Sequence, residues 1–138
     1  MRNACHYPEV SEPEQTVREF FRLLALPDTK AAVELLDPEV VWRNSGLPTV
    51  KGRRVGGILL DSEKRGLTVD IMIHHAAADG DTVLTDRTDV LRKGKWETSF
   101  WVRGTFEVRD GKITLWDDAF SWLDFTRGSL MGLTRLFS

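Results

Sequence analysis

The segment that decides the fold is residues 67–120, LTVDIMIHHAAADGDTVLTDRTDVLRKGKWETSFWVRGTFEVRDGKITLWDDAF. Short glycine-bearing turns divide it at Asp79-Gly80, Lys93-Gly94 and Asp110-Gly111. Turns of this kind between β-type segments are the strongest local signal for β-hairpins. We therefore expect an antiparallel meander of successive strands at 67–78, 81–92, 95–109 and 112–120.

Helical patterns precede this segment. Ser11-Glu12-Pro13-Glu14 is a capping box with proline in the first turn, and apolar residues follow it at helical spacing. These features predict a first helix that ends near Leu26, and further helices at 30–36 and 52–66 flank a short strand at 40–44. Helices first and a long sheet afterwards are typical of an α+β fold, here a curved, mostly antiparallel sheet with helices packed on its concave side.

The two ends of the chain differ from this pattern. Residues 1–10 lack periodicity, so we expect a flexible N-terminal arm there. No linker, repeat or low-complexity tract divides residues 11–138, which predicts a single domain. The apolar residues of 122–137 favour a final helix, although Gly128 and Gly132 weaken that prediction.

Composition excludes several classes of function. The single cysteine rules out an intrachain disulfide and a thiolate metal cluster, and the net charge of −2 gives no reason to expect nucleic acid as partner. No apolar run approaches the roughly 20 residues that a membrane-spanning helix needs. No leader-like apolar run opens the chain either. A soluble, cytoplasmic protein is therefore expected.

Charged residues interrupt two of the expected strands. Because side chains alternate along a strand, Arg87 and Asp89 share one face of the second strand of the meander, and Asp118 shares a face with Trp116 and Phe120 in the last. Charges among bulky apolar groups are costly to bury unless they pair. If these faces converge, they form a carboxylate–guanidinium–carboxylate cluster in an apolar pocket, an arrangement suited to moving protons.

Three stretches of the sequence resemble the limonene-1,2-epoxide hydrolase family, whose cone-shaped fold is similar to nuclear transport factor 2 and the polyketide cyclases. They are Trp42-Arg43-Asn44-Ser45-Gly46-Leu47-Pro48, Thr85-Asp86-Arg87-Thr88-Asp89-Val90, and the segment from Gly104 to Asp118. The order and spacing of the elements agree with the family from about Pro13 onward.

The resemblance implies a role for several residues. Asp118 falls where the family has the carboxylate that deprotonates the attacking water. Asp89 falls on the acid that protonates the epoxide oxygen, and Arg87 on the guanidinium that bridges the two acids. Asn44 matches a residue that holds the water, and Trp42 stands where the family usually has a tyrosine with the same duty.

Such residues suffice for one-step opening of an epoxide without metal, nucleotide or other cofactor, and an arginine can hold two carboxylates by bidentate hydrogen bonds. Trp42 departs from the family pattern because an indole can donate a hydrogen bond but cannot accept one. Trp116 and Phe120 are candidates for the substrate-binding wall, since they share the face of Asp118.

Plainer interpretations stay open from the sequence alone. Arg87 and Asp89 could form an exposed cross-strand ion pair, Asp118 could cap the following segment, and Asn44 could be a turn residue. The adjacent His74 and His75 should point to opposite faces, one of them into the core or pocket, so they cannot bind one metal ion together.

We therefore expect an epoxide hydrolase that converts a small lipophilic epoxide and water to a vicinal diol, and the resemblance implies a homodimer. An isomerase or cyclase of the same fold would need an aspartate base without a second carboxylate. A non-catalytic, lipophile-binding dimeric module would leave Arg87 and Asp89 exposed, and fold alone cannot decide among these functions.

Overall fold

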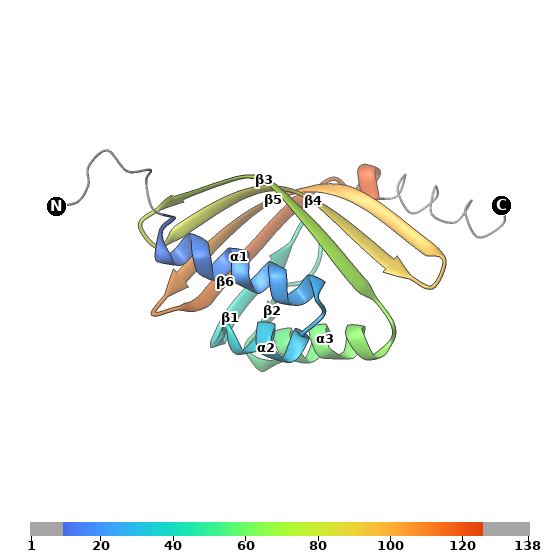
Figure 1. The fold of residues 1–138 in the computed structure, drawn as a ribbon, viewed down its shortest axis with the longest axis horizontal. Helices are drawn as coiled ribbons and strands as arrows, with labels where there is room; N and C mark the ends of the chain where they lie inside the picture. The colour runs from blue at the N-terminus through green and yellow to red at the C-terminus, as the bar shows by residue number, and fades with distance from the viewer. Residues whose placement is uncertain (1–9, 126–138) are drawn as a thin grey trace.

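The computed structural model describes residues 10–125, which build a six-stranded sheet in the order β2-β1-β6-β5-β4-β3. The strands are β1 (Leu36–Asn44), β2 (Val50–Lys51), β3 (Thr68–Asp79), β4 (Thr82–Lys93), β5 (Trp96–Arg109) and β6 (Lys112–Phe120). The helices are α1 (Glu12–Ala25), α2 (Thr29–Glu34) and α3 (Arg53–Lys64). In Figure 1 the strands β3 to β6 arch over α1, and α2 and α3 lie together below it.

The antiparallel meander predicted from the glycine-bearing turns is confirmed. Strand β3 pairs antiparallel with β4, β4 with β5, and β5 with β6. At the turns Gly80, Gly94 and Gly111 have φ of 60°, 60° and 75°, in the left-handed region that glycine adopts at little cost. The predicted α+β class, with a curved sheet and helices on one of its faces, is confirmed as well.

The part of the sheet outside the meander was predicted only in part. Strand β1 begins at Leu36 rather than at 40, and β2 was not predicted. Strand β1 pairs in parallel with β6 and carries a register shift between Leu36 and Val41. Pro38 lies inside this irregular stretch, where a proline costs no regular ladder hydrogen bond.

Helix α1 begins as the capping box predicts, because the Ser11 side chain accepts a hydrogen bond from the Glu14 N–H at 3.3 Å. Its apolar face, with Val17, Phe20 and Phe21, is buried against the sheet. On the sheet side the core contains Val83, Val108 and Ile113, together with Phe106 and Trp116. The helix therefore covers the inner face of the sheet on which the charged residues lie.

The two adjacent histidines depart from prediction. Strand β3 shifts its register with β4 between Ile73 and His75. This bulge breaks the alternation of side chains, so His74 and His75 are both exposed, and the prediction that one of them enters the core or pocket is wrong. His74 lies 2.8 Å from the Thr88 hydroxyl, and His75 lies 3.4 Å from Asp86.

The expected N-terminal arm and most of the expected final helix lie outside the described residues. A helical turn does begin at Trp122 within them. No helix in residues 10–125 is long and apolar enough to cross a membrane.

Candidate active site

The register of the sheet places the charged residues side by side. Thr85 of β4 is opposite Gly104 of β5, Gly104 is opposite Asp118 of β6, and Asp118 is opposite Asn44 of β1. Arg87 follows Thr85 on the same face of β4, so its long side chain can reach diagonally across Gly104 to β6. The convergence expected from strand alternation is therefore observed.

Arg87 holds both carboxylates at once. Its Nε and Nη2 donate to the two Asp89 oxygens at 3.0 and 2.9 Å, and its Nη1 and Nη2 donate to the two Asp118 oxygens at 3.0 Å each. Nη1 also donates to the Thr85 hydroxyl at 3.3 Å. Arg87 is 0% exposed, Asp118 5% and Asp89 9%, so the interpretation as an exposed cross-strand ion pair is wrong.

Three neighbours that the sequence reasoning missed make this burial possible. The Arg87 guanidinium lies over the Phe21 ring at 4.5 Å and the Phe106 ring at 5.9 Å from the centroids, which favours a cation. Gly104 leaves the space in which Arg87 meets Asp118, because a Cβ there would lie 2.6 Å from an atom of each. A glycine inside a strand often marks such a close approach, and that signal could have identified Gly104.

Electrostatics differ between the charged groups. Burial raises the pKa of the Asp118 carboxyl above its ordinary value, and this outweighs the opposing effects of Arg87 and of the Trp116 N–H. Burial alone would lower the pKa of the Arg87 guanidinium, but the two carboxylates raise it, so Arg87 is a permanent cation. One cation therefore faces two acids, which favours retention of a single proton by the carboxyl pair.

Hydrogen bonds distinguish the two acids. Asp118 accepts from Arg87 at both oxygens and from the Trp116 indole N–H at 2.9 Å, whereas Asp89 accepts from Arg87 alone among the described residues. Arg87 donates to both oxygens of each acid, so the additional Trp116 N–H is the donor that distinguishes Asp118, and it favours the ionised form of that carboxyl. The Trp116 N–H offsets part of the rise in the Asp118 pKa that burial causes, and a carboxylate whose pKa is raised suits a general base.

Strand β1 contributes Trp42 and Asn44 to the same wall. The Trp42 ring stacks on Trp116 with centroids 4.5 Å apart and an interplanar angle of 16°. The buried Trp42 Nε1 makes no hydrogen bond with any of residues 10–125. Asn44 is opposite Asp118 and lines the cavity, and its carbonyl also accepts from Leu47 N at 3.0 Å to begin a turn. Asn44 is therefore both a turn residue and a residue of the site.

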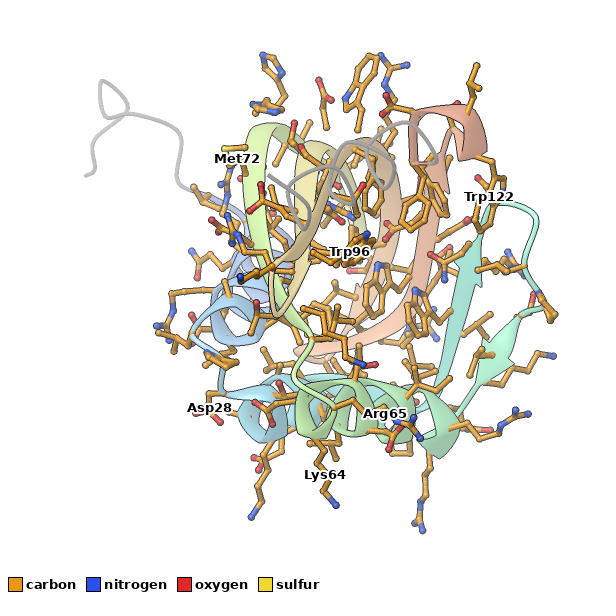
Figure 2. All side chains as sticks on the ribbon, turned by 90° about the vertical axis from the view of Figure 1, so that its right-hand side faces the viewer. Asp28, Lys64, Arg65, Met72, Trp96 and Trp122 are labelled. Atoms are coloured by element: carbon orange, nitrogen blue, oxygen red, sulfur yellow. The ribbon has the colours of Figure 1, made fainter. Side chains whose placement is uncertain are left out.

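A cavity of about 320 Å³ lies between this wall and the helices. All the predicted site residues line it except Arg87, which lies behind Asp89 and Asp118. The view in Figure 2 is toward the end of the molecule where the sheet lies above α2 and α3. The apolar lining residues are Phe21, Leu24, Pro27, Trp42, Leu47, Ile58, Leu59, Leu67, Val69, Ile71, Leu91, Phe100, Val102, Trp116, Phe120, Trp122 and Phe125.

The geometry also decides whether Asp118 is a helix cap. The helical turn at Trp122 receives its cap from Ser121, whose hydroxyl accepts from Asp124 N at 3.3 Å, so Asp118 is not the cap. Within residues 10–125 no group of three or more His, Cys, Asp or Glu side chains is arranged to hold a metal ion.

The curved sheet, with helices on one face and a cavity between them, is the cone-shaped α+β fold of proteins similar to nuclear transport factor 2. An NTF2-like protein from Burkholderia xenovorans LB400 superposes with a TM-score of 0.67 at 21% identity, over 88% of this chain and 98% of that one. At that identity the similarity shows the fold alone.

Closer similarity identifies the family. The family model for the limonene-1,2-epoxide hydrolase catalytic domain matches residues 11–130. Epoxide hydrolase EphG of Mycobacterium tuberculosis is 38% identical over 120 residues, which cover 87% of this chain and 80% of that protein. The structure of an M. tuberculosis epoxide hydrolase similar to limonene-1,2-epoxide hydrolase (LEH-like) superposes with a TM-score of 0.88 at 38% identity, over 94% of this chain and 98% of that one. The chain belongs to the limonene-1,2-epoxide hydrolase family, and the family and enzyme class predicted from the sequence are confirmed.

Proposed function

We propose that this enzyme adds water to a small lipophilic epoxide in one step and releases a vicinal diol. The observation that carries the proposal is the buried Arg87, which holds Asp89 and Asp118 by paired hydrogen bonds at the wall of an apolar cavity. The apolar lining suits a hydrocarbon substrate, and the two acids supply the groups that both ends of the reaction need.

In the proposed step Asp118 takes a proton from a water molecule while the water oxygen forms a bond to one oxirane carbon. The bond between that carbon and the epoxide oxygen breaks, and its electron pair stays on the oxygen, which takes a proton from Asp89. Asn44 and the Trp42 N–H hold the water. A proton passing from Asp118 to Asp89 restores the starting state, so the sum is epoxide plus water to diol.

The arrangement of charges favours this division of labour. The raised pKa of Asp118 brings its basicity closer to neutrality, where a general base is most effective. With one cation between two acids, a single proton on the carboxyl pair leaves the cluster neutral, which is the form that an apolar wall tolerates best. No step draws on a metal or an organic cofactor.

The competing functions fit less well. An isomerase or cyclase needs only one aspartate base, whereas this cavity contains two acids joined by an arginine. A module that only binds lipophiles has no use for a buried charge cluster, which costs free energy of desolvation. We keep both as outcomes of the test.

The test is diol formation from a panel of cyclic, aromatic and long-chain epoxides. Asp118→Asn should lower kcat by about 10²–10⁴-fold, the usual contribution of a general base. Asp117→Asn is the matched control, because Asp117 is the adjacent acid on the opposite face of β6 and does not line the cavity. A fully active Asp118→Asn enzyme would remove Asp118 as the base. Folded parent enzyme that hydrolyses no epoxide would favour the isomerase or the binding module.

We also propose a cytoplasmic homodimer, as the family similarity implies. The outer face of the sheet supports association, because Trp101, Leu84 and Met72 are each about half exposed there. Light scattering of Trp101→Glu beside the parent would test it. A dimeric Trp101→Glu variant would exclude this face as the contact.

A further inference from the structure

The polar groups of the cavity form two sets. The first set belongs to the sheet: Asn44, Asp89 and Asp118 carry the proposed reaction, and Thr68 lies at the start of β3. The second set, Thr29 of α2 with Ser62 and Glu63 of α3, belongs to the helices, and no step of the reaction uses it. Figure 2 labels Asp28 and Lys64, the chain neighbours of Thr29 and Glu63, on the helical side below the sheet. The cavity is therefore polar on two different walls.

Thr29 and Glu63 are joined to each other. Thr29 is 5% exposed, and its hydroxyl donates to Glu63 Oε2 at 3.1 Å. Glu63 forms no salt bridge with any of residues 10–125, and among them Oε1 accepts no hydrogen bond. The Ser62 hydroxyl also has no hydrogen-bond partner among those residues. A carboxylate oxygen that can accept and a hydroxyl that can donate thus border the same cavity, and neither is hydrogen-bonded to any of residues 10–125.

Stability alone does not account for an acid at this place. Glu63 lies in the last turn of α3, where the partial negative charge of the helix end disfavours a carboxylate. Its hydrogen bond with Thr29 links α2 to α3, but a neutral glutamine could accept that bond equally well. The negative charge and the second oxygen have no structural use among the described contacts.

We propose that Glu63, Ser62 and Thr29 form a subsite for a hydroxyl group on the substrate, remote from its epoxide. A hydroxyl donates one hydrogen bond and accepts others, which matches Glu63 as acceptor and Ser62 as donor. An ammonium group would offer only donors and would leave Ser62 without its complement. The inference rests on the proposed function and narrows its substrate to a hydroxylated lipophilic epoxide.

The experiment compares 1,2-epoxyoctane with 7,8-epoxyoctan-1-ol, which differ only in a terminal hydroxyl. For the parent, kcat/KM should favour the hydroxylated substrate by about 10- to 100-fold, as expected for a hydrogen bond to a charged group. Glu63→Gln should reduce this preference at least fivefold, because the loss in kcat/KM falls mainly on the hydroxylated substrate. Asp61→Asn is the control, because Asp61 is an exposed acid of the same helix, paired with Arg65.

Other outcomes would overturn the proposal. Equal losses on both substrates in Glu63→Gln would mean that Glu63 serves only to join the helices. A parent preference for 8-amino-1,2-epoxyoctane over the alcohol would mean that the subsite recognises a cation. A parent with no preference between the first two substrates would exclude the subsite.

Binding separates this proposal from the proposed reaction. Octane-1,2-diol and octane-1,2,8-triol can be titrated against tryptophan fluorescence, because Trp42, Trp116 and Trp122 line the cavity. Tighter binding of the triol that weakens in Glu63→Gln supports the subsite even if the parent hydrolyses no epoxide. Equal binding of the two polyols, from an enzyme that does hydrolyse epoxides, rejects the subsite alone.

Discussion

Gly104→Ala is the substitution that tests the site geometry most directly. An added Cβ would lie 2.6 Å from Arg87 Nη1, 2.6 Å from Asp118 Oδ1 and 3.0 Å from Phe106 Cε1. Ordinary contact begins at 3.4 Å, so the two charged atoms must each retreat by about 0.8 Å, the difference between 2.6 and 3.4 Å. These atoms are the donor and acceptor of one 3.0 Å hydrogen bond, so neither side chain is free to swing away from the added Cβ.

The expected cost has two parts. Overpacking of a buried site costs about 1–3 kcal/mol of folding free energy, which lowers the Tm by about 3–10 °C in a domain of this size. Displacement of a catalytic group by about 1 Å costs about 10²-fold in rate. We expect both losses together, measured by calorimetry and by kcat on the best epoxide of the panel.

Gly57→Ala is the matched control for this prediction. Gly57 lies inside α3, and a Cβ there would meet nothing within 4 Å. Replacing a helical glycine by alanine usually stabilises by about 0.5–1 kcal/mol, and kcat should not change. If Gly104→Ala had the Tm of the parent and a kcat within twofold of the parent value, the close packing of Arg87 on Asp118 would be irrelevant to the reaction.

Three further predictions concern the same wall. Arg87→Lys should lower kcat by at least about 10²-fold and lower the Tm, because one ammonium cannot donate to both carboxylates bidentately; an active lysine variant would refute the bridging role. Burial raises the pKa of Asp118 and the base must be ionised, so kcat should fall as the pH falls through that raised value. The acid limb of the pH profile should therefore lie above the ordinary carboxyl pKa of about 3.9. An acid limb at or below that value would mean that the limb does not report the ionisation of Asp118. Trp42→Phe keeps an aromatic ring on Trp116 but removes the five-membered half of the indole, including the N–H that has no partner in residues 10–125. The lost packing should lower the Tm slightly, and kcat should fall about tenfold. An unchanged kcat would show that the N–H does not hold the water.

The sequence carried the local information about this fold. The glycine-bearing turns predicted the meander, and the capping box at Ser11 predicted the start of α1, because both depend on residues close together in the chain. The parallel pairing of β1 with β6 joins residues more than 70 positions apart, such as Asn44 and Asp118, and no local pattern specifies it. The bulge that exposes both His74 and His75 is likewise set by pairing with β4.

The candidate site divides in the same way. Strand alternation placed Arg87, Asp89 and Asp118 on converging faces, and the resemblance added Asn44 and Trp42. The sequence did not reveal the residues that make the buried charges tolerable, namely Phe21, Phe106 and Gly104. Phe21 looks like any apolar position of an amphipathic helix, and only the packing of α1 on the sheet shows that it covers a cation.

The enclosure of Arg87 has a consequence for how the enzyme loses activity. Among residues 10–125 Arg87 is the largest fully buried side chain, and Phe21 of α1 covers it. If α1 lifts from the sheet, water reaches the guanidinium and each acid can exchange its partner for solvent. Local detachment of α1 in dilute denaturant would therefore abolish activity while the meander stays folded. Activity should be lost at the denaturant concentration at which the amides of α1 begin to exchange, below the concentration at which those of the strands do.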